Sequence, residues 1–427
     1  MITAGLCATS DIASIATRAE TPYILLQLDS RVATEISPLD FDRMARVAEN
    51  TGSVMVYADY FEAEGDRFTP HPLNDYQPGS VRDDFDFGPL ALIDTEALRQ
   101  VAATLPEFKH AAWYATRLAL SREGKITHIP EPLYSASPAS AGSQFDYVNP
   151  RNREVQKEME LAFTLHLSLI GALLSPPFAE FVPAGEYPVE ASVIIPVKNR
   201  ATTVADAVKS ALSQETDFSF NVIVVDNHST DGTTDLLRSL AAADSRVIHI
   251  IPESLTLGIG GCWNVAVGSA SCGRYAVQLD SDDLYSSPST LKRIIDSFRS
   301  ERAAIVIGSY QLTDFDLNPI PPGVIDHREW TEHNGPNNAL RINGLGAPRA
   351  FCTELVRRYP FPNVSYGEDY AMALRMTRSY KLARIYDVLY LCRRWRGNSD
   401  ASLSLEKANR FNHYKDTLRT WEISARQ

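Results

Sequence analysis

Four short apolar runs, each followed by a stretch of helical periodicity or by acids, constrain the fold of this chain more than any other feature. They are Val193–Val197, Asn221–Val225, Val247–Ile251 and Tyr275–Leu279. Strands with so few polar side chains are typical of sheets covered on both faces. Strand and helix in alternation predict an α/β fold with a mostly parallel sheet and helices on both sides. Such sheets bind ligands beyond the carboxyl ends of their strands.

Acidic side chains follow two of these strands. Asp226 ends the second run, and Asp280, Asp282 and Asp283 follow the fourth. Three acids within four residues repel one another unless something neutralises them, and carboxylates at a sheet edge are suitable ligands for Mg²⁺ or Mn²⁺. The alternative is a solvated turn in which an Asp caps the next helix.

The bulk composition narrows the class of protein. The 427 residues allow two or three domains, and 44% hydrophobic with 22% charged residues is typical of a globular protein. A net charge of −12, from 41 basic and 53 acidic residues, argues against broad nucleic-acid binding. It does not exclude an anionic small ligand, because local fields can oppose the global sign.

Cysteines and apolar segments bear on location. None of the five cysteines forms a CxxC pair, which favours free thiols in a reducing compartment. Residues 1–5 do not resemble a signal peptide. The most apolar segment, Met159–Leu174, is short for a membrane span, so we expect a buried helix, with an interfacial helix as the alternative. A cytoplasmic protein is expected, with peripheral contact at the cytoplasmic membrane face left open.

Composition shifts divide the chain into four parts. Residues 62–87 are polar and rich in Asp, Pro and Gly, which predicts a long loop, and residues 135–150 read as a linker. The expected domains are an N-terminal α/β region (1–150), a helix and linker (151–188), the main α/β domain (189–400) and a C-terminal helix (401–427).

Five motifs occur in a fixed order. They are Ser192–Arg200, Val224–Thr233, Gly258–Asn264, Leu279–Asp283 and Gly367–Asp369. Together they resemble the family 2 glycosyltransferases, which have the GT-A fold, and the resemblance covers roughly Val189 to Asn398. Each motif alone is weak, but five in order at compatible spacing are specific.

The resemblance implies a role for each matching position. Asp369 would be the catalytic base, with Glu368 beside it; the alternative for Asp369 is helix capping, and the two roles are compatible. The metal, Mn²⁺ or Mg²⁺, would be held by Asp280, Asp282 and Asp283. The nucleotide sugar, with a UDP-sugar favoured, would lie against the following residues: Pro196, Asn199, Arg200, Asp226, Asn264, Asp280 and Ser281.

One position departs from the family pattern. Many relatives place a His shortly after the last core strand, but this chain reads Leu391-Cys-Arg-Arg-Trp-Arg-Gly-Asn-Ser399. Either water or another group completes the metal site, or Arg393, Arg394 and Arg396 neutralise the diphosphate directly. The alternative for these arginines is surface salt bridging.

The N-terminal region resembles a damaged copy of the later half of the main domain. Tyr23–Ser30 resembles Tyr275–Ser281 with one residue inserted, and six further residues between Tyr114 and Tyr134 match residues 256 positions later. In this copy Arg31 and Val32 stand for Asp282 and Asp283, while Ala112 and Trp113 stand for Glu368 and Asp369. We therefore expect a non-catalytic, partial GT-A-like half domain that braces the catalytic domain, binds acceptor glycan or forms a dimer contact.

The leading hypothesis is an inverting, metal-dependent glycosyltransferase that acts on a glycan or lipid-linked acceptor in surface polysaccharide synthesis. The alternatives are a nucleotidyltransferase or Mg²⁺-dependent phosphohydrolase that uses the same acids, and a non-catalytic carbohydrate-binding protein. Acceptor choice is expected in the segment Asp314–Arg349, where Trp330, His333, Asn337 and Asn338 are candidate sugar contacts.

Overall fold

The computed structural model describes residues 6–138, 152–328, 334–395, 397–398 and 403–427. It forms two compact units. Unit 1 comprises residues 1–174, 340–343 and 403–427, and unit 2 comprises residues 175–339 and 344–402. Unit 1 therefore includes the C-terminal helix and a four-residue segment, Leu340–Asn343, from the middle of the main domain.

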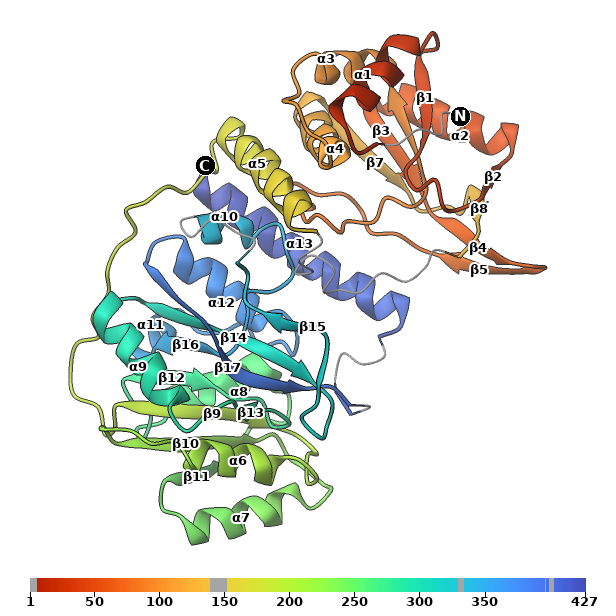
Figure 1. Cartoon of the computed structure of the whole chain (residues 1–427). Helices are drawn as coiled ribbons and strands as arrows, with labels where there is room; N and C mark the ends of the chain where they lie inside the picture. The colour runs from red at the N-terminus through yellow and green to blue at the C-terminus, as the bar shows by residue number, and fades with distance from the viewer. Residues whose placement is uncertain (1–5, 139–151, 329–333, 396, 399–402) are drawn as a thin grey trace. The chain divides into compact units, whose positions relative to one another are not determined.

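The sheet of unit 2 begins with four parallel strands and then becomes mixed (Figure 1). The parallel strands, in spatial order, are β11 (Val247–Ile250), β10 (Phe220–Asp226), β9 (Ala191–Val197) and β12 (Tyr275–Gln278). They agree closely with the four apolar runs. Every residue of β10 and β12 is buried, as strands covered on both faces require.

Beyond β12 the sheet contains both antiparallel and parallel pairs. The strand β16 (Arg349–Cys352) is antiparallel to both β12 and β14 (Ile305–Thr313), and β17 (Leu382–Arg393) is parallel to β14. The short strand β13 (Leu284–Tyr285) pairs with β17, and β15 (Pro319–Ile325) pairs with β14, both antiparallel. Helices connect the strands: α6 (Val204–Leu212), α7 (Thr233–Ala243), α8 (Ile259–Gly268), α9 (Thr290–Glu301), α10 (Gly335–Asn338), α11 (Thr353–Arg358) and α12 (Glu368–Thr377).

The described residues of unit 1 form two four-stranded sheets. The first has the order β1 (Tyr23–Gln27), β6 (Leu90–Asp94), β3 (Ser53–Ala58) and β7 (Lys125–Ile129), and the second has the order β2 (Thr34–Ile36), β8 (Tyr134–Ala136), β4 (Tyr60–Glu64) and β5 (Arg67–His71). Its helices are α1 (Thr9–Arg18), α2 (Pro38–Thr51), α3 (Thr95–Ala102), α4 (Ala112–Glu123), α5 (Arg153–Leu169) and α13 (Leu405–Arg426).

Local sequence explains the bounds of α2. Ser37 caps its N-terminus by accepting a hydrogen bond from Asp40 N at 3.1 Å, and Pro38 occupies the first turn. Gly52 ends the helix in the left-handed conformation, with φ of 62°.

The prediction of a long loop over residues 62–87 is wrong for its first part, where β4 and β5 form a hairpin. Gly65 takes a left-handed φ of 59° at the turn. All of β5 except His71 is exposed, so the strand carries no apolar alternation that the sequence could reveal.

The two units share a strand topology, in agreement with the internal repeat. In unit 1 the directions along β1-β6-β3-β7 are antiparallel, antiparallel and parallel, and β12-β16-β14-β17 in unit 2 repeats them. The second sheet of unit 1 repeats the pairing of β13, β17, β14 and β15. The described part of unit 1 has no counterpart of β9, β10 and β11.

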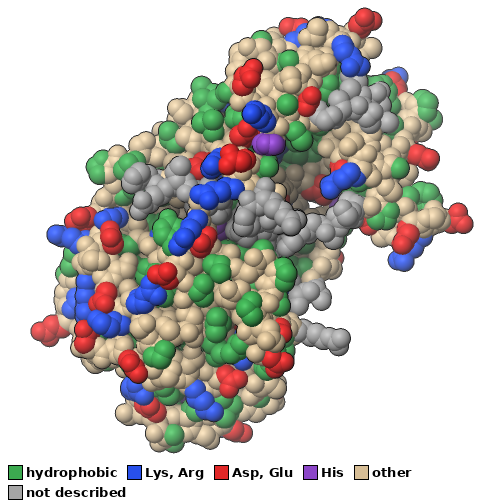
Figure 2. Space-filling model, viewed as in Figure 1, with side chains coloured by type: hydrophobic (Ala, Val, Ile, Leu, Met, Phe, Trp, Pro, Cys, Tyr) green, Lys and Arg blue, Asp and Glu red, His purple; other side chains and the backbone are tan. Residues whose placement is uncertain are grey.

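Charged side chains of both signs lie interspersed on the face of unit 2 that Figure 2 shows. Among the described residues, no helix has both the length and the apolar character needed to cross a bilayer.

Candidate active site

The first acid of the site, Asp280, is fixed by the strand that precedes it and by β17. Gln278 Nε2 donates to both carboxylate oxygens of Asp280, at 3.0 and 3.1 Å, and the Asp280 amide donates to the Tyr390 hydroxyl at 3.0 Å. Gln278 and Asp280 lie two residues apart and therefore share one side of the chain. The turn closes when the amide of Asp283 donates to the carbonyl of Asp280 at 3.2 Å.

Three loops of unit 2 converge on Asp282. Its Oδ2 atom accepts hydrogen bonds from Trp395 Nε1 at 3.1 Å and Asn398 Nδ2 at 3.2 Å, and Arg200 Nε lies 3.8 Å away. Arg200 also donates from Nη2 to the carbonyl of Gly397 at 3.1 Å. The turns after β9, β12 and β17 therefore meet at one carboxylate, as expected for the carboxyl edge of this sheet.

Asp283 supports the turn. It is buried, and its Oδ1 accepts from the backbone amide of Arg393 at 2.8 Å. Burial, followed by the charges of Asp280 and Asp282, raises the pKa of the Asp283 carboxyl well above its usual range. Burial also raises the pKa of Asp280, with Asp282 and Asp369 adding to the effect. This concentration of negative charge favours a cation at the turn.

The donor set fits a hard divalent ion, although not one held by protein alone. In the described ranges, no group of three His, Cys, Asp or Glu side chains has the arrangement of a metal cage. Mg²⁺ is commonly bound by one or two carboxylates together with water and substrate phosphates. Asp280 and Asp282 are the residues placed to supply such carboxylates, while Asp283 is engaged with β17.

The arginines after β17 differ in their surroundings. Arg393 is 3% exposed, donates from Nε to the carbonyl of Asp282, and lies 3.3 Å from Asp206 Oδ2. Its Nη2 is buried without a hydrogen-bond partner. The amide of Arg394 donates to the carbonyl of Thr313 at 2.7 Å. Arg396 lies outside the described residues, as do Trp330 and His333, and the roles predicted for all of them stay predictions.

Asp369 lies at the N-terminus of α12 and is ion-paired with an arginine that the sequence did not indicate. Asp369 Oδ2 lies 2.8 Å from Arg349 Nη1, and 29% of the Asp369 side chain is exposed. Burial of the Arg349 guanidinium lowers its pKa, but the negative charges of Asp369 and then Asp280 raise it. The pKa of Arg349 is raised overall. One cation therefore lies near both Asp369 and the acids after β12.

Glu368 is in a different state from its neighbour. It is 8% exposed, and its Oε2 atom is buried without a hydrogen-bond partner. Burial, with the charge of Asp369 second, raises the Glu368 pKa to about 8. A carboxyl of this kind is protonated at neutral pH, so Asp369 is the better proton acceptor of the two.

The predicted nucleotide end of the site is held together by internal hydrogen bonds. Asp226 is 0% exposed and accepts from Ser229 N at 3.0 Å, Thr234 Oγ1 at 2.5 Å and His249 Nε2 at 3.4 Å. Burial opposes its ionisation, but the hydrogen bonds from Ser229 and Thr234 lower the Asp226 pKa. Its predicted contact with the base stays a prediction.

The other predicted nucleotide contacts lie on neighbouring turns. Pro196 is half-buried on β9. Asn199, with φ of 55°, accepts from Thr230 N at 2.8 Å and so joins the turns after β9 and β10. Ser281 is buried in the acidic turn. Asn264 exchanges two hydrogen bonds with the backbone of Phe361, at 2.8 and 2.9 Å. Asn264 thus fixes the segment that leads to α12, a positioning role that the sequence did not suggest.

Sequence reasoning missed Gln278, Arg349, Trp395 and Asn398 as site residues. Gln278 had a signal, because it precedes Asp280 by two positions on a predicted strand. Trp395 and Asn398 lie in the same short segment as the predicted arginines, but neither side chain belonged to a recognised motif. Arg349 had no local signal, since only the pairing of β16 with β12 brings it near the acids.

Comparisons with known proteins identify the family. Residues 192–364 match the family model described as glycosyl transferase family 2. The chain is 35% identical over 189 residues to the putative teichuronic acid biosynthesis glycosyltransferase TuaG of Bacillus subtilis, covering 44% of this chain and 71% of that protein.

Two further relatives are matched over less of their length. The succinoglycan biosynthesis protein ExoO of Rhizobium meliloti is 32% identical over 143 residues, which are 34% of this chain and 38% of that protein. The O-antigen chain rhamnosyltransferase WbaN of Salmonella anatum is 27% identical over 203 residues, covering 45% and 62%.

Solved structures are also similar. The S. aureus TarS 1–349 complex with UDP-GlcNAc gives a TM-score of 0.42 at 18% identity, covering 56% of this chain and 72% of that one. The mannosyltransferase PcManGT from Pyrobaculum calidifontis, in complex with GDP-Man and Mn²⁺, gives 0.38 at 18% identity, covering 64% and 85%. The expected α/β fold is confirmed by the sheet and helices of unit 2, and the match to the family model agrees with the GT-A class. The match to the family model and the extent of the likeness to TuaG show that this chain belongs to glycosyltransferase family 2.

Proposed function

We propose that this glycosyltransferase is metal-dependent and inverting, and that it moves a sugar from a nucleoside diphosphate to a hydroxyl of a growing polysaccharide or lipid-linked acceptor. The observation that carries the proposal is the position of Arg349. Its guanidinium lies 2.8 Å from Asp369, and the negative charge of Asp280 also raises its pKa. This arrangement supports Asp369 as the proton acceptor beside the acids that we propose hold the donor.

The proposed reaction breaks the bond between C1 of the sugar and the diphosphate oxygen and forms a bond from C1 to the acceptor oxygen. Asp369 takes the proton of the attacking hydroxyl. Attack from the face opposite the leaving group inverts the anomeric centre. A divalent ion, when bound through Asp280 and Asp282, supplies Lewis-acid stabilisation of the departing diphosphate.

The names of the relatives support the substrate class. TuaG, ExoO and WbaN are named for teichuronic acid, succinoglycan and O-antigen synthesis, which are all polysaccharides. The similar solved structures contain UDP-GlcNAc, UDP or GDP-Man. We therefore propose a nucleoside diphosphate sugar as donor, with a UDP-sugar as the first to test.

The test is a panel of UDP-, GDP- and dTDP-sugars, each incubated with Mn²⁺, with Mg²⁺ or with EDTA. Turnover of one donor with metal and loss of turnover in EDTA are expected. Asp369→Asn should lower kcat by about 10²- to 10⁴-fold, the usual contribution of a general base. Asp235→Asn, at a side chain 83% exposed on α7, is the matched control and should behave as wild type.

Two results would overturn parts of the proposal. Full activity in EDTA would show that the reaction does not need a metal. Wild-type activity of Asp369→Asn would show that Asp369 is not the base. Release of inorganic pyrophosphate in place of a nucleoside diphosphate would favour nucleotidyl transfer. The anomeric configuration of the product, read from the C1 proton coupling in an NMR spectrum, tests inversion.

A further inference from the structure

The side chain of Gln278 joins two parts of the candidate active site in unit 2. It is 5% exposed and lies at the end of β12, where the strand leads into the acidic turn. Its Nε2 atom donates to both carboxylate oxygens of Asp280, at 3.0 and 3.1 Å, and its Oε1 atom accepts from the backbone amide of Arg349 at 3.2 Å. One buried amide group therefore contacts both Asp280 and the arginine that pairs with Asp369.

The contact with Arg349 lies where the backbone pairing of β12 and β16 ends. The last pair in the register is Val277 with Ala350, and beyond it the amide of Arg349 donates to the side chain of Gln278. The carbonyl of Gln278 accepts from the Tyr285 hydroxyl at 3.0 Å. The first residue of β16 is thus held by a side chain, so the position of Arg349 depends on the residue type at position 278.

The two partners of Gln278 allow only one orientation of its amide group. A carboxylate accepts hydrogen bonds and a backbone amide donates them, so Nε2 must face Asp280 and Oε1 must face Arg349. The reversed orientation would place Oε1 against the carboxylate and Nε2 against the N–H group, and the hydrogen bonds on both sides would be lost. The orientation of Asp280 and the position of Arg349 are therefore linked through one planar group.

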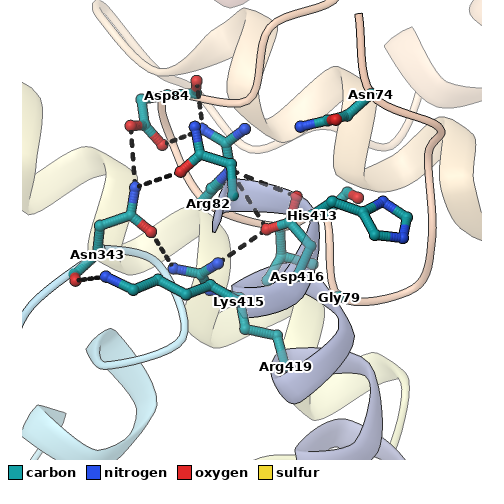
Figure 3. Close-up of polar contacts among 12 residues, drawn as sticks. Asn74, Gly79, Arg82, Asp84, Asn343, His413, Lys415, Asp416 and Arg419 are labelled. Atoms are coloured by element: carbon teal, nitrogen blue, oxygen red, sulfur yellow. Dashed lines mark hydrogen bonds and ion pairs between the residues drawn. The ribbon is translucent and has the colours of Figure 1, made fainter. Parts of the chain in front are cut away.

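A buried acid of unit 1 illustrates a different way to hold a carboxylate. Asp416 accepts from Arg419 Nη1 at 2.8 Å and lies 3.2 Å from Arg82 Nε, and the side chains of Asp416 and Arg419 are both 0% exposed (Figure 3). Two guanidinium groups neutralise this carboxylate, as a buried charge requires. Its negative charge is therefore not available to a further cation.

Asp280 is held by a neutral group instead. Both of its carboxylate oxygens accept from the Gln278 amide, and among the residues that the structure describes no cation forms an ion pair with Asp280. The charge of Arg349 acts on Asp280, but its guanidinium is paired with Asp369 at 2.8 Å. A neutral donor fixes the direction of the carboxylate and leaves its charge available, as a residue that orients a metal ligand must do.

The repeat contains the same glutamine in unit 1, where its contacts differ. The sequence Gln27-Leu-Asp29 corresponds to Gln278-Leu-Asp280. Gln27 Nε2 donates to the backbone carbonyls of Asp29 and Val32 and not to a carboxylate. The carboxylate of Asp29 is instead held by an arginine two positions later.

The second partner of the glutamine also differs between the units. In the register of the repeat, Ala91 on β6 stands where β16 has Arg349. The strand forms in unit 1 without this arginine and without a contact from the glutamine to the acid. The contact between Gln278 and Asp280 is therefore not a requirement of the strand, which favours a role in the chemistry of unit 2.

We propose that Gln278 is a positioning residue that links Asp280 to Asp369. It holds the carboxylate of Asp280, a proposed metal ligand, in one orientation, and through the amide of Arg349 it fixes the arginine that orients Asp369. This inference rests on the proposed function and names a residue outside the five motifs that carry the family resemblance. Loss of Gln278 should weaken metal binding and should also slow the reaction at saturating metal.

The test uses two variants of the full chain and a matched control. Gln278→Met has a similar length but cannot supply the amide hydrogen bonds, and Gln278→Asn keeps the amide on a side chain too short to span both partners. Gln214 is another buried glutamine of unit 2, 6% exposed, which donates to the carbonyl of Ser287 at 2.9 Å and accepts from the amide of Leu291 at 2.8 Å. Gln214→Met should therefore lower Tm without changing the acidic turn.

Mn²⁺ affinity, measured by electron paramagnetic resonance, gives a readout that needs no turnover. Gln278→Met and Gln278→Asn should bind Mn²⁺ about tenfold more weakly than the wild type, the lower end of the usual effect for groups that orient metal ligands. Gln214→Met should bind Mn²⁺ as the wild type does.

Hydrogen exchange tests the second contact. In both Gln278 variants the amide of Arg349 should exchange faster, because it loses its acceptor. The amide of Cys352, which donates to the carbonyl of Ala304 at 3.1 Å, should be unchanged. At saturating Mn²⁺ the kcat for transfer should remain about tenfold or more below that of the wild type, since the arginine beside Asp369 is less well held.

Three results would overturn the inference: unchanged Mn²⁺ affinity in the folded Gln278 variants, an equal loss of affinity in Gln214→Met, or unchanged exchange at Arg349. A wild type that binds no Mn²⁺ would overturn the metal dependence in the proposed function and this inference with it. A wild type that binds Mn²⁺ but turns over no donor would contradict the proposed function alone, and the Mn²⁺ and exchange measurements would still decide the role of Gln278.

Discussion

Arg349 Nη1 lies 2.8 Å from Asp369 Oδ2, which gives the proposed base a fixed cationic partner. Arg349→Gln should lower kcat/KM about a hundredfold, because the carboxylate loses the group that orients it. Arg349→Lys keeps the positive charge but lacks the planar guanidinium, so its kcat/KM should lie between those of Arg349→Gln and the wild type. Steady-state transfer assays with the active donor test this order. Equal activity of Gln and wild type would show that the ion pair is only structural.

Asp282 depends on Trp395 and Asn398 for its orientation. Removing either donor, in Trp395→Phe or Asn398→Ala, should weaken Mn²⁺ binding by about tenfold, the lower end of the usual effect for groups that orient metal ligands. Titration of Mn²⁺ followed by electron paramagnetic resonance measures this without turnover. Trp421→Phe, at a ring 62% exposed, serves as the control for the aromatic change. Unchanged affinity in both site variants would mean that Asp282 does not bind the ion.

His166 should make unit 1 sensitive to acid. Burial, with the charge of Arg122 second, lowers the His166 pKa to about 3, and its Nδ1 accepts from Arg122 Nη1 at 2.8 Å. Below pH 6.5 the unfolded chain takes up a proton at this residue and the folded chain does not. Stability present above pH 6.5 is therefore lost as the pH falls from 6.5 toward 3.

The matched variants are His166→Gln, which can still accept from Arg122, and His110→Gln at an exposed site. Urea unfolding between pH 7 and pH 4 should show a shallower loss of stability for His166→Gln than for wild type. His110→Gln should follow the wild-type curve. Parallel curves for all three proteins would contradict the assignment.

Gly260 allows close packing between α8 and the segment that leads to α12. A Cβ atom there would lie 2.0 Å from the carbonyl of Pro362 and 3.0 Å from Glu368 Cβ. Gly260→Ala should destabilise the protein by about 1–3 kcal/mol and also lower activity, since the displaced segment precedes Asp369.

Gly268 lies in the same helix with nothing within 4 Å of its added Cβ, so Gly268→Ala should be neutral or stabilising by up to about 1 kcal/mol. Urea unfolding of both variants measures the difference. A stable, active Gly260→Ala would show that the segment after Phe361 can move at little cost.

Features of the fold that depend on neighbouring residues could be predicted from the sequence. The parallel strands of unit 2 followed from their apolar character, and the acids after β12 followed from their spacing. Helix α2 could be bounded from Ser37, Pro38 and Gly52. The hairpin of β4 and β5 could not be predicted, because an exposed strand leaves no hydrophobic pattern.

The remaining features depend on pairing between distant parts of the chain. Arg349 reaches Asp369 only because β16 lies between β12 and β14. The charges of α13 look like an ordinary solvated helix in the sequence, since no local rule indicates that Asp416 and Arg419 are fully buried. Long-range contacts of this kind are not encoded in spacing or periodicity.

The pairing of Asp29 with Arg31 bears on whether substitutions could give unit 1 a donor-binding site. Arg31 donates to both carboxylate oxygens of Asp29, at 2.9 and 2.7 Å, so a guanidinium neutralises the acid of the repeat. Restoring carboxylates at residues 31 and 32 would return charge without a nucleotide pocket, because the described part of unit 1 has no counterpart of β9, β10 and β11. Substitutions alone cannot rebuild three missing strands. We therefore expect carboxylates at residues 31 and 32 alone to give unit 1 no metal-dependent donor binding.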